Sequence, residues 1–171
     1  MSWIFRTTEV VPYAHNVILE SCTGRLYAAF QAGNTEGGSM YLSIAWSLDA
    51  TTWSHPQIVV QSFNDRSAWG PVLKCDDRGV LHLFYAMSKA KVEDFSNPGG
   101  DLYRKTLSDG VWSDGRLICN QSSWGNDDPL YFVNQLVTLE DGSWLIPFGS
   151  TSQGYPASSG AAGESARGAK R

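Results

Sequence analysis

One carboxyl group in this sequence stands where it could do acid–base chemistry. Glu36 lies in segment 32–38 (Ala-Gly-Asn-Thr-Glu-Gly-Gly), whose glycines would let the chain lie close over a ligand. A glutamate in such a loop could donate a proton if burial raised its pKa. A glycosidic bond is broken by two such carboxyl groups, or their equivalents, set across it. The alternative is that Glu36 is a solvated residue at a loop tip.

Other side chains suit binding better than catalysis. Trp69 offers a ring face on which a sugar could stack, and Asp65 and Arg66 come shortly before it. Asp127 and Asp128 are adjacent, but two carboxylates are far from a complete calcium loop, so solvated turn residues are the alternative. The sequence has no nucleophile elbow, phosphate loop, His-Glu-x-x-His or Cys-x-x-Cys motif. We therefore expect no metal and no cofactor.

These candidates lie on a unit that repeats along the chain. Segments 17–30, 71–85 and 135–148 each read as an apolar strand, a polar turn with a glycine, and a strand that ends in an aromatic residue. The turn glycines supply the positive φ that a tight hairpin needs; they are Gly24, Gly79 and Gly142. Their spacing of roughly 55 to 63 residues suits a four-stranded blade with its loops.

The second half of the unit repeats as well. Segment 40–46 leads into a turn that ends at Trp53, and segment 101–106 leads into a turn that ends at Trp112. No segment keeps an apolar period of 3.6 residues, so almost no helix is expected. The sequence predicts an all-β chain of antiparallel β-meander blades, which stack on one another as in a β-propeller.

One turn carries a recognisable motif. Segment 47–53 (Ser-Leu-Asp-Ala-Thr-Thr-Trp) resembles the Asp-box, or bacterial neuraminidase repeat, of the sialidase superfamily. Its structural positions are Ser47, Asp49 and Trp53, and a shorter copy keeps Asp109 and Trp112. The aspartate is expected to accept hydrogen bonds from turn amides while the tryptophan packs beneath the turn. Such boxes support the fold and lie away from the ligand.

The resemblance covers residues 14–149 and implies roles for particular side chains. His15 stands where sialidases have the first arginine that binds the substrate carboxylate, and imidazole is a weaker, pH-dependent substitute. Glu36 falls in the loop that carries the family's acid/base residue. Arg66, Trp69 and Asn134, near the inner strands of the second and third blades, are further candidates for substrate binding. The nucleophilic Tyr–Glu pair and the other arginines come from later blades.

The implied function is a glycoside hydrolase that removes a terminal sugar such as sialic acid. The alternative is a non-catalytic propeller that binds glycans or proteins through loop aromatics such as Trp69. A carbohydrate or glycoconjugate is the expected partner of the enzyme.

The resemblance also divides the chain. Residues 14–149 correspond to about two and a half blades of a sialidase-like β-propeller. Residues 1–13 form an N-terminal extension with Arg6 at the surface, and residues 150–171 form a Gly/Ser/Ala-rich tail that is expected to be disordered. We therefore expect an incomplete fragment, whose exposed blade face favours self-association.

Composition excludes several function classes. The net charge is −4, so no basic field favours nucleic acid. No stretch reaches about 18 apolar residues and no signal peptide opens the chain, so a soluble protein, cytoplasmic by default, is expected. Cys22, Cys75 and Cys119 are too few and scattered for a disulfide framework, and we expect them to be small buried hydrophobic residues.

Overall fold

The computed structural model describes residues 3–35, 38–64, 66–89, 98–124, 128–132 and 135–150. Its first sheet is a four-stranded antiparallel meander in which each strand pairs with the next. Its strands are β1 (Tyr13–Cys22), β2 (Arg25–Gly33), β3 (Tyr41–Ser47) and β4 (Gln57–Val60). We call this sheet blade 1.

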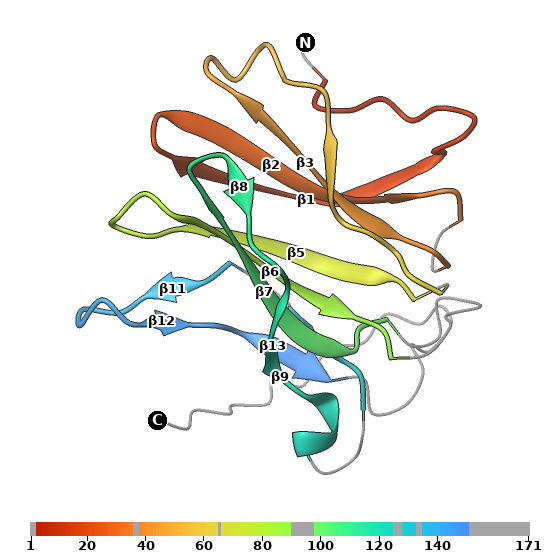
Figure 1. Ribbon diagram of the computed structural model, residues 1–171, viewed down its shortest axis with the longest axis vertical. Helices are drawn as coiled ribbons and strands as arrows, with labels where there is room; N and C mark the ends of the chain where they lie inside the picture. The colour runs from red at the N-terminus through yellow and green to blue at the C-terminus, as the bar shows by residue number, and fades with distance from the viewer. Residues whose placement is uncertain are drawn as a thin grey trace, which may run out of the picture.

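The second sheet, blade 2, repeats this meander and lies beside the first in Figure 1. Its strands are β5 (Ala68–Cys75), β6 (Leu81–Met87), β7 (Asp101–Ser108), β8 (Val111–Trp112) and β9 (Arg116–Cys119). Both β8 and β9 pair with β7, so β9 takes the outermost place that β4 has in blade 1. A short 3-10 helix, Gln121–Trp124, follows.

A third hairpin lies on the far side of blade 2 (Figure 1). Strand β10 (Leu130–Phe132) pairs with β13 (Phe148–Ser150), and between them β11 (Val137–Thr138) pairs with β12 (Trp144–Leu145). The chain is therefore all-β, with antiparallel meander blades of a partial β-propeller, as the sequence predicted. No helix in the described part of the chain is long and apolar enough to cross a membrane.

Local turn chemistry explains where the hairpins reverse. Thr23 and Gly24 both have positive φ and form the two-residue turn between β1 and β2. The turns of the other two hairpins share one hydrogen-bond pattern. The amide of Gly79 donates to Asp76, and that of Gly142 donates to Leu139. The turns at all three predicted glycines are thus confirmed.

The Asp-box turn is also held by hydrogen bonds between residues close in sequence. The Asp49 carboxylate accepts the amides of Thr52 and Thr51 at 2.7 and 2.8 Å, and also the Ser47 hydroxyl at 3.0 Å. The two amides hold the pKa of Asp49 well below its usual range. In the shorter copy, Asp109 accepts the hydroxyl of Ser108 at 3.2 Å.

The two box tryptophans are both half-buried. Trp112 packs against the first hydrophobic cluster, which lies between blades 1 and 2. Both boxes are in turns beyond an outer strand, Trp53 between β3 and β4 and Trp112 on β8. They brace hairpins at the outer side of the blades.

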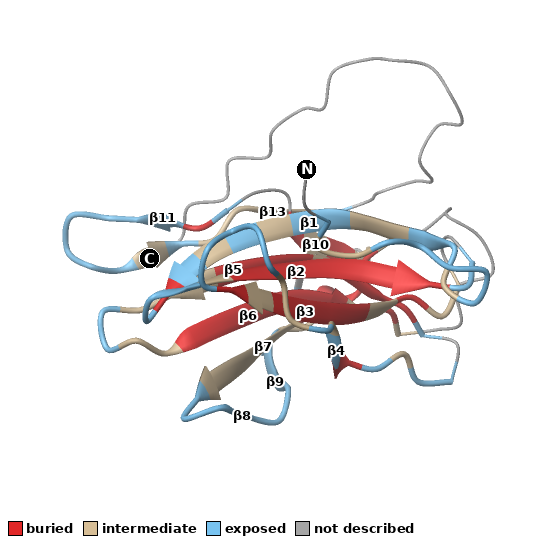
Figure 2. Ribbon diagram, turned by 90° about the horizontal axis from the view of Figure 1, so that it is seen from above, coloured by how far each residue is buried: buried red, intermediate tan, exposed pale blue. Residues whose placement is uncertain are grey.

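Strand β6 shows how the blades stack. Its side chains alternate between two hydrophobic clusters: Leu81, Leu83 and Tyr85 face blade 1, while Phe84 and Ala86 face the third hairpin. Figure 2 shows β2, β3 and β6 buried along most of their length. A strand that is apolar on both faces needs a neighbour on each side, which is the stacking predicted for blades.

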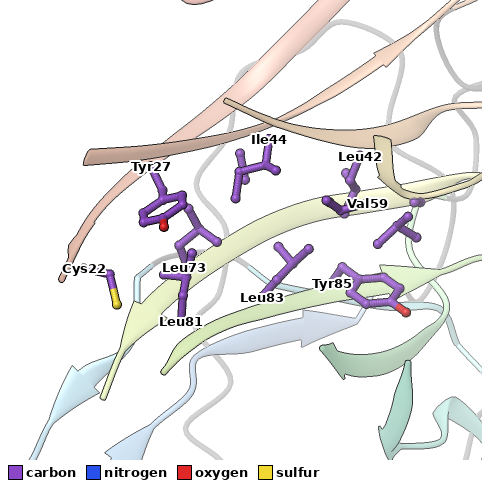
Figure 3. Close-up of a cluster of buried hydrophobic side chains, with 12 residues drawn as sticks. Cys22, Tyr27, Leu42, Ile44, Val59, Leu73, Leu81, Leu83 and Tyr85 are labelled. Carbon is purple, nitrogen blue, oxygen red and sulfur yellow. The ribbon is translucent and has the colours of Figure 1, made fainter. Parts of the chain in front are cut away.

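The first hydrophobic cluster joins blade 1 to blade 2. Figure 3 shows Tyr27, Leu42 and Ile44 of blade 1 pointing toward Leu73 and Leu83 of blade 2. Apolar side chains on the third hairpin remain exposed instead, and they are Val137, Leu139 and Leu145. Self-association through an exposed blade face stays a prediction.

A disulfide joins the two blades at the turn end. Cys22 at the end of β1 is bonded to Cys75 at the end of β5, with their Cα atoms 5.4 Å apart. The expectation that both are simple buried hydrophobic residues was wrong, because blade stacking brings together positions 53 residues apart. The Glu20 carboxylate also accepts the Cys75 amide at 3.0 Å.

Candidate functional site

The innermost strands of blades 1 and 2 carry matching irregularities. The pairing of β1 with β2 shifts between His15 and Ile18, and the pairing of β5 with β6 shifts between Trp69 and Val72. Each bulge contains a residue with positive φ, Asn16 at 54° and Gly70 at 49°. Bulges re-aim side chains and are frequent beside functional sites. The end of the blades opposite the disulfide is therefore the first place to seek a site.

A buried amide ties the two bulges together. The side chain of Gln31 in β2 is completely buried. Its Oε1 accepts Asn16 Nδ2 at 2.7 Å and the Gly70 amide at 3.2 Å, while its Nε2 donates to the Ala68 carbonyl at 3.1 Å. Three hydrogen bonds to a buried side chain fix it strongly. Gln31 thus sets the position of one inner strand against the next.

His15 lies beside this network, at the start of the β1 bulge. His15 as a whole is half-buried. Its Nε2 atom is buried and has no hydrogen-bond partner among the described residues. Such an atom is costly unless a ligand or solvent satisfies it. A cavity of about 330 Å³ adjoins the bulge, and its walls are Trp3, Ile4, Phe5, Ala14, His15, Asn16, Val17 and Phe30.

A second hollow runs along the inner strands. It has a volume of about 760 Å³ and shares Asn16 and Val17 with the first cavity. Its walls come from β1, β5, β10 and the β11 hairpin, and they include Gly70, Pro71 and Phe132. Among the described residues, neither hollow is lined by a carboxylate, lysine or arginine.

The comparisons with known proteins agree with this architecture. The family model described as "BNR repeat-like domain" matches residues 24–164, which is most of the chain. The chain belongs to the BNR repeat-like domain family. No curated protein matches the sequence significantly.

Two solved structures show the fold of this BNR repeat-like chain. One is a protein of unknown function from Dyadobacter fermentans, with a TM-score of 0.60 and 15% identity, and the match covers 81% of this chain and 47% of that one. The other is an α-L-arabinanase from Penicillium chrysogenum complexed with arabinobiose, with a TM-score of 0.56 and 16% identity, covering 84% and 40%. The chain thus spans less than half the length of either protein.

The structure of the BNR repeat-like chain describes some of the predicted site residues and not others. Glu36 and Asn134 lie outside the described residues. Arg66 is exposed in the loop before β5, where its backbone amide donates to Phe63. His15 is on the cavity wall.

Trp69 is where the structure argues against the predicted role. Only 3% of its surface is exposed, and it belongs to the hydrophobic cluster between blade 2 and the third hairpin. Its indole Nε1 donates to the Ser88 hydroxyl at 2.7 Å. A ring covered on this scale has no free face for a sugar, so Trp69 is part of the core.

Sequence reasoning missed Asn16 and Gln31. The sequence does carry a signal for Gln31, because it is the one residue with a side-chain amide in the otherwise apolar segment 26–33 (Leu-Tyr-Ala-Ala-Phe-Gln-Ala-Gly). A buried polar residue in a strand needs partners, and here these are the two bulges. Asn16 was hidden because nothing in the sequence marks a bulge at that point.

A second histidine with an unpartnered ring nitrogen lies toward the other end of blade 2. His82 Nδ1 has no partner among the described residues, while its Nε2 is 3.3 Å from the Asp76 carboxylate. Burial lowers the pKa of His82. Burial by itself would raise the pKa of Asp76, but hydrogen bonds from Val80, His82 and Arg78 outweigh it and lower the pKa to about 2. This pair braces a turn. The described residues hold no cluster of three or more His, Cys, Asp or Glu suited to a metal.

Proposed function

We propose that this chain forms the sugar-holding part of a glycoside hydrolase-type β-propeller, with a terminal sugar bound beside His15. The observation that carries the proposal is His15 on the wall of a cavity at the bulged end of blade 1, with its Nε2 buried and without a hydrogen-bond partner among the described residues. Membership of the BNR repeat-like domain family and the fold shared with an arabinanase support it.

His15 and Asn16 are the proposed binding groups. A neutral imidazole exchanges one hydrogen bond with a sugar hydroxyl, and a protonated one also attracts a carboxylate. The sialidase resemblance favours sialic acid as the terminal sugar, whereas the arabinanase similarity favours a neutral pentose. Both classes belong in the first assay.

Glu36 is the proposed general acid. It follows β2 by three positions in the sequence, and β2 carries Gln31, which holds the bulges in place. Proton donation to the leaving oxygen requires a carboxyl whose pKa is raised by the closed site. The second carboxyl or its equivalent is not among the residues that line the described hollows.

The residues that line the described hollows favour one second candidate, a non-catalytic propeller that binds a glycan. A binding module needs polar groups and apolar walls but no pair of carboxyls. Trp69 is excluded from such a role by its burial, so the binding surface would be the cavity beside His15.

The test is turnover of a fluorogenic sialoside and a fluorogenic arabinofuranoside by the natural protein that contains these 171 residues. We expect Glu36→Gln to abolish hydrolysis and Glu9→Gln, an exposed carboxyl outside the site, to leave it unchanged. We expect His15→Ala to raise KM, with His55→Ala as its exposed control. Full activity in Glu36→Gln would contradict the acid assignment. Sugar binding without turnover would favour the second candidate.

A further inference from the structure

We propose that Gln31 is a positioning residue, which turns the carboxamide of Asn16 so that its Oδ1 accepts a hydrogen bond from a sugar hydroxyl. The inference rests on the proposed function, because Asn16 is one of its binding groups. It adds the residue that orients Asn16 and the kind of ligand group that this orientation takes. All of the contacts involved lie between β1, β2 and β5, where blades 1 and 2 meet.

Two backbone groups fix which way the Gln31 amide lies. The Gly70 N–H can only donate, and it donates to Oε1 at 3.2 Å. The Ala68 carbonyl can only accept, and it accepts from Nε2 at 3.1 Å. Exchanging Oε1 and Nε2 would set donor against donor and acceptor against acceptor around a completely buried side chain. The backbone of β5 therefore decides the orientation of the Gln31 amide.

The orientation of Gln31 in turn fixes that of Asn16. Because Oε1 carries no hydrogen, the Asn16 atom that lies 2.7 Å from it must be a donor, which is Nδ2. One hydrogen of Nδ2 is thus used by Gln31, and Oδ1 remains as the acceptor of the side chain. Within the described part of the chain, no donor is bonded to this oxygen.

The two bulges show that the backbone alone does not require this arrangement. Asn16 and Gly70 occupy corresponding places, with φ of 54° and 49°, and glycine meets that conformational need without a side chain. What asparagine adds is the carboxamide. Asn16 is exposed, so water could satisfy this group, but a buried residue binds it instead. A side chain held in one orientation is preorganised for a ligand.

The acceptor selects the ligand group. A sugar hydroxyl can donate to Asn16 Oδ1, whereas an ionised carboxylate has no hydrogen to donate. Asn16 therefore takes a hydroxyl, which every neutral sugar offers, and the carboxylate of a sialic acid would need a different partner.

The first experiment tests the orientation without any ligand, by urea unfolding of the natural protein that contains these residues. Asn16→Asp replaces the Nδ2 donor with an acceptor, which the fixed Gln31 oxygen cannot match. We expect the urea midpoint to fall by about 0.3 to 1 M, and to fall less in Asn16→Gly, which removes the group and suits the positive φ. Asn64→Asp is the matched control, because Asn64 is also exposed and has a φ of 48°. An unchanged midpoint in Asn16→Asp would overturn the orientation assigned to Asn16.

The second experiment asks whether Gln31 acts on the ligand through Asn16. Isothermal titration calorimetry measures the affinity for arabinobiose and for sialyllactose. Asn16→Gly should weaken arabinobiose binding about 3- to 10-fold, the usual effect of one lost hydrogen bond. Gln31→Met should weaken it similarly, but should have no further effect on affinity in the Asn16→Gly background, although its effect on stability should persist there. Asn64→Gly should leave affinity and stability unchanged.

The outcomes separate this inference from the proposed function. Additive losses of affinity in the double variant would show that Gln31 only supports the fold, and would overturn its positioning role. Unchanged arabinobiose affinity in Asn16→Gly, a loss confined to sialyllactose, or no binding of either sugar would overturn the hydroxyl assignment. Coupled losses of affinity without any turnover would support this inference while the hydrolase proposal fails. Turnover with independent effects of the two residues would do the reverse.

Discussion

Reducing the Cys22–Cys75 disulfide should destabilise the protein substantially. The bond connects the ends of β1 and β5, so it crosses from one blade to the next. In the folded protein the two blades also share a hydrophobic cluster, which keeps Cys22 buried. Cutting the bond therefore acts mainly on the unfolded chain, which gains freedom when the loop is opened.

The size of the effect follows from the length of that loop. The cysteines are 53 residues apart in sequence. For a loop of that length, the cross-link lowers the conformational entropy of the unfolded chain by about 14 cal/mol/K. This corresponds to about 4 kcal/mol of stabilisation at room temperature. Native disulfides commonly contribute about 2 to 5 kcal/mol, so we expect a decrease in the free energy of unfolding of about 3 kcal/mol.

Urea unfolding of oxidised and reduced protein measures this directly. With an m-value of about 2 kcal/mol/M, the urea midpoint should fall by about 1.5 M on reduction. Cys22→Ser and Cys75→Ser should each reproduce the reduced protein under oxidising conditions. Cys119→Ser is the matched control, because Cys119 lies outside the disulfide. It should leave the difference between oxidised and reduced protein intact.

Two results would refute the reasoning. Titration of three reactive thiols in the denatured, unreduced protein would show that the bond does not form. Equal urea midpoints for the oxidised and reduced proteins would show that the bond forms but does not limit the unfolded chain. In that case the blades must retain contact after unfolding.

Three further substitutions test the ends of the blades by urea unfolding. Gln31→Ala should cost about 2 to 4 kcal/mol, because it removes three hydrogen bonds and leaves the Ala68 carbonyl and the part-buried Gly70 amide without the Gln31 side chain; a change below about 1 kcal/mol would show that water replaces the side chain. Asp76→Asn concerns pH: the folded pKa of about 2 lies below the ordinary value of 3.8, so the stabilisation is complete above about pH 5 and is lost as pH falls toward 2. The variant should lack that part of the pH dependence of stability. An unchanged dependence of stability on pH would contradict this role of Asp76. Gly100→Ala should cost more than about 3 kcal/mol, because its φ is 154° and a Cβ would overlap the Met87 carbonyl oxygen; wild-type stability would mean that the strand end shifts freely.

The architecture could be predicted because its signals are local. The glycines of the three turns and the Asp49 carboxylate act on their own hairpins, within a few residues of their positions. The two apolar faces of β6 can also be read from the sequence. A strand that is apolar on both faces requires a neighbouring layer on each side. Fold class therefore followed from short segments read one at a time.

The contacts between blades could not be predicted in the same way. The disulfide and the Gln31 bonds to Ala68 and Gly70 join residues far apart in the chain, at places decided by how one sheet twists over the next. Trp69 was misread for a related reason. Its position before Gly70 resembles a loop, but the residue lies inside β5 at a bulge, and the third hairpin covers its ring.

The repeat then explains why blade 1 rather than blade 2 carries the candidate site. His15 pairs with Gln31 in the first sheet, and Trp69 pairs with Ala86 in the second, so the two residues occupy corresponding places beside a bulge. In blade 2 a large aromatic ring fills that place and packs against Leu130 and Phe132 of β10. In blade 1 His15 occupies that place instead; it lines a cavity, and its Nε2 has no hydrogen-bond partner among the described residues. The same backbone feature serves packing where the side chain is apolar, and it leaves a polar group to be satisfied where the side chain is an imidazole.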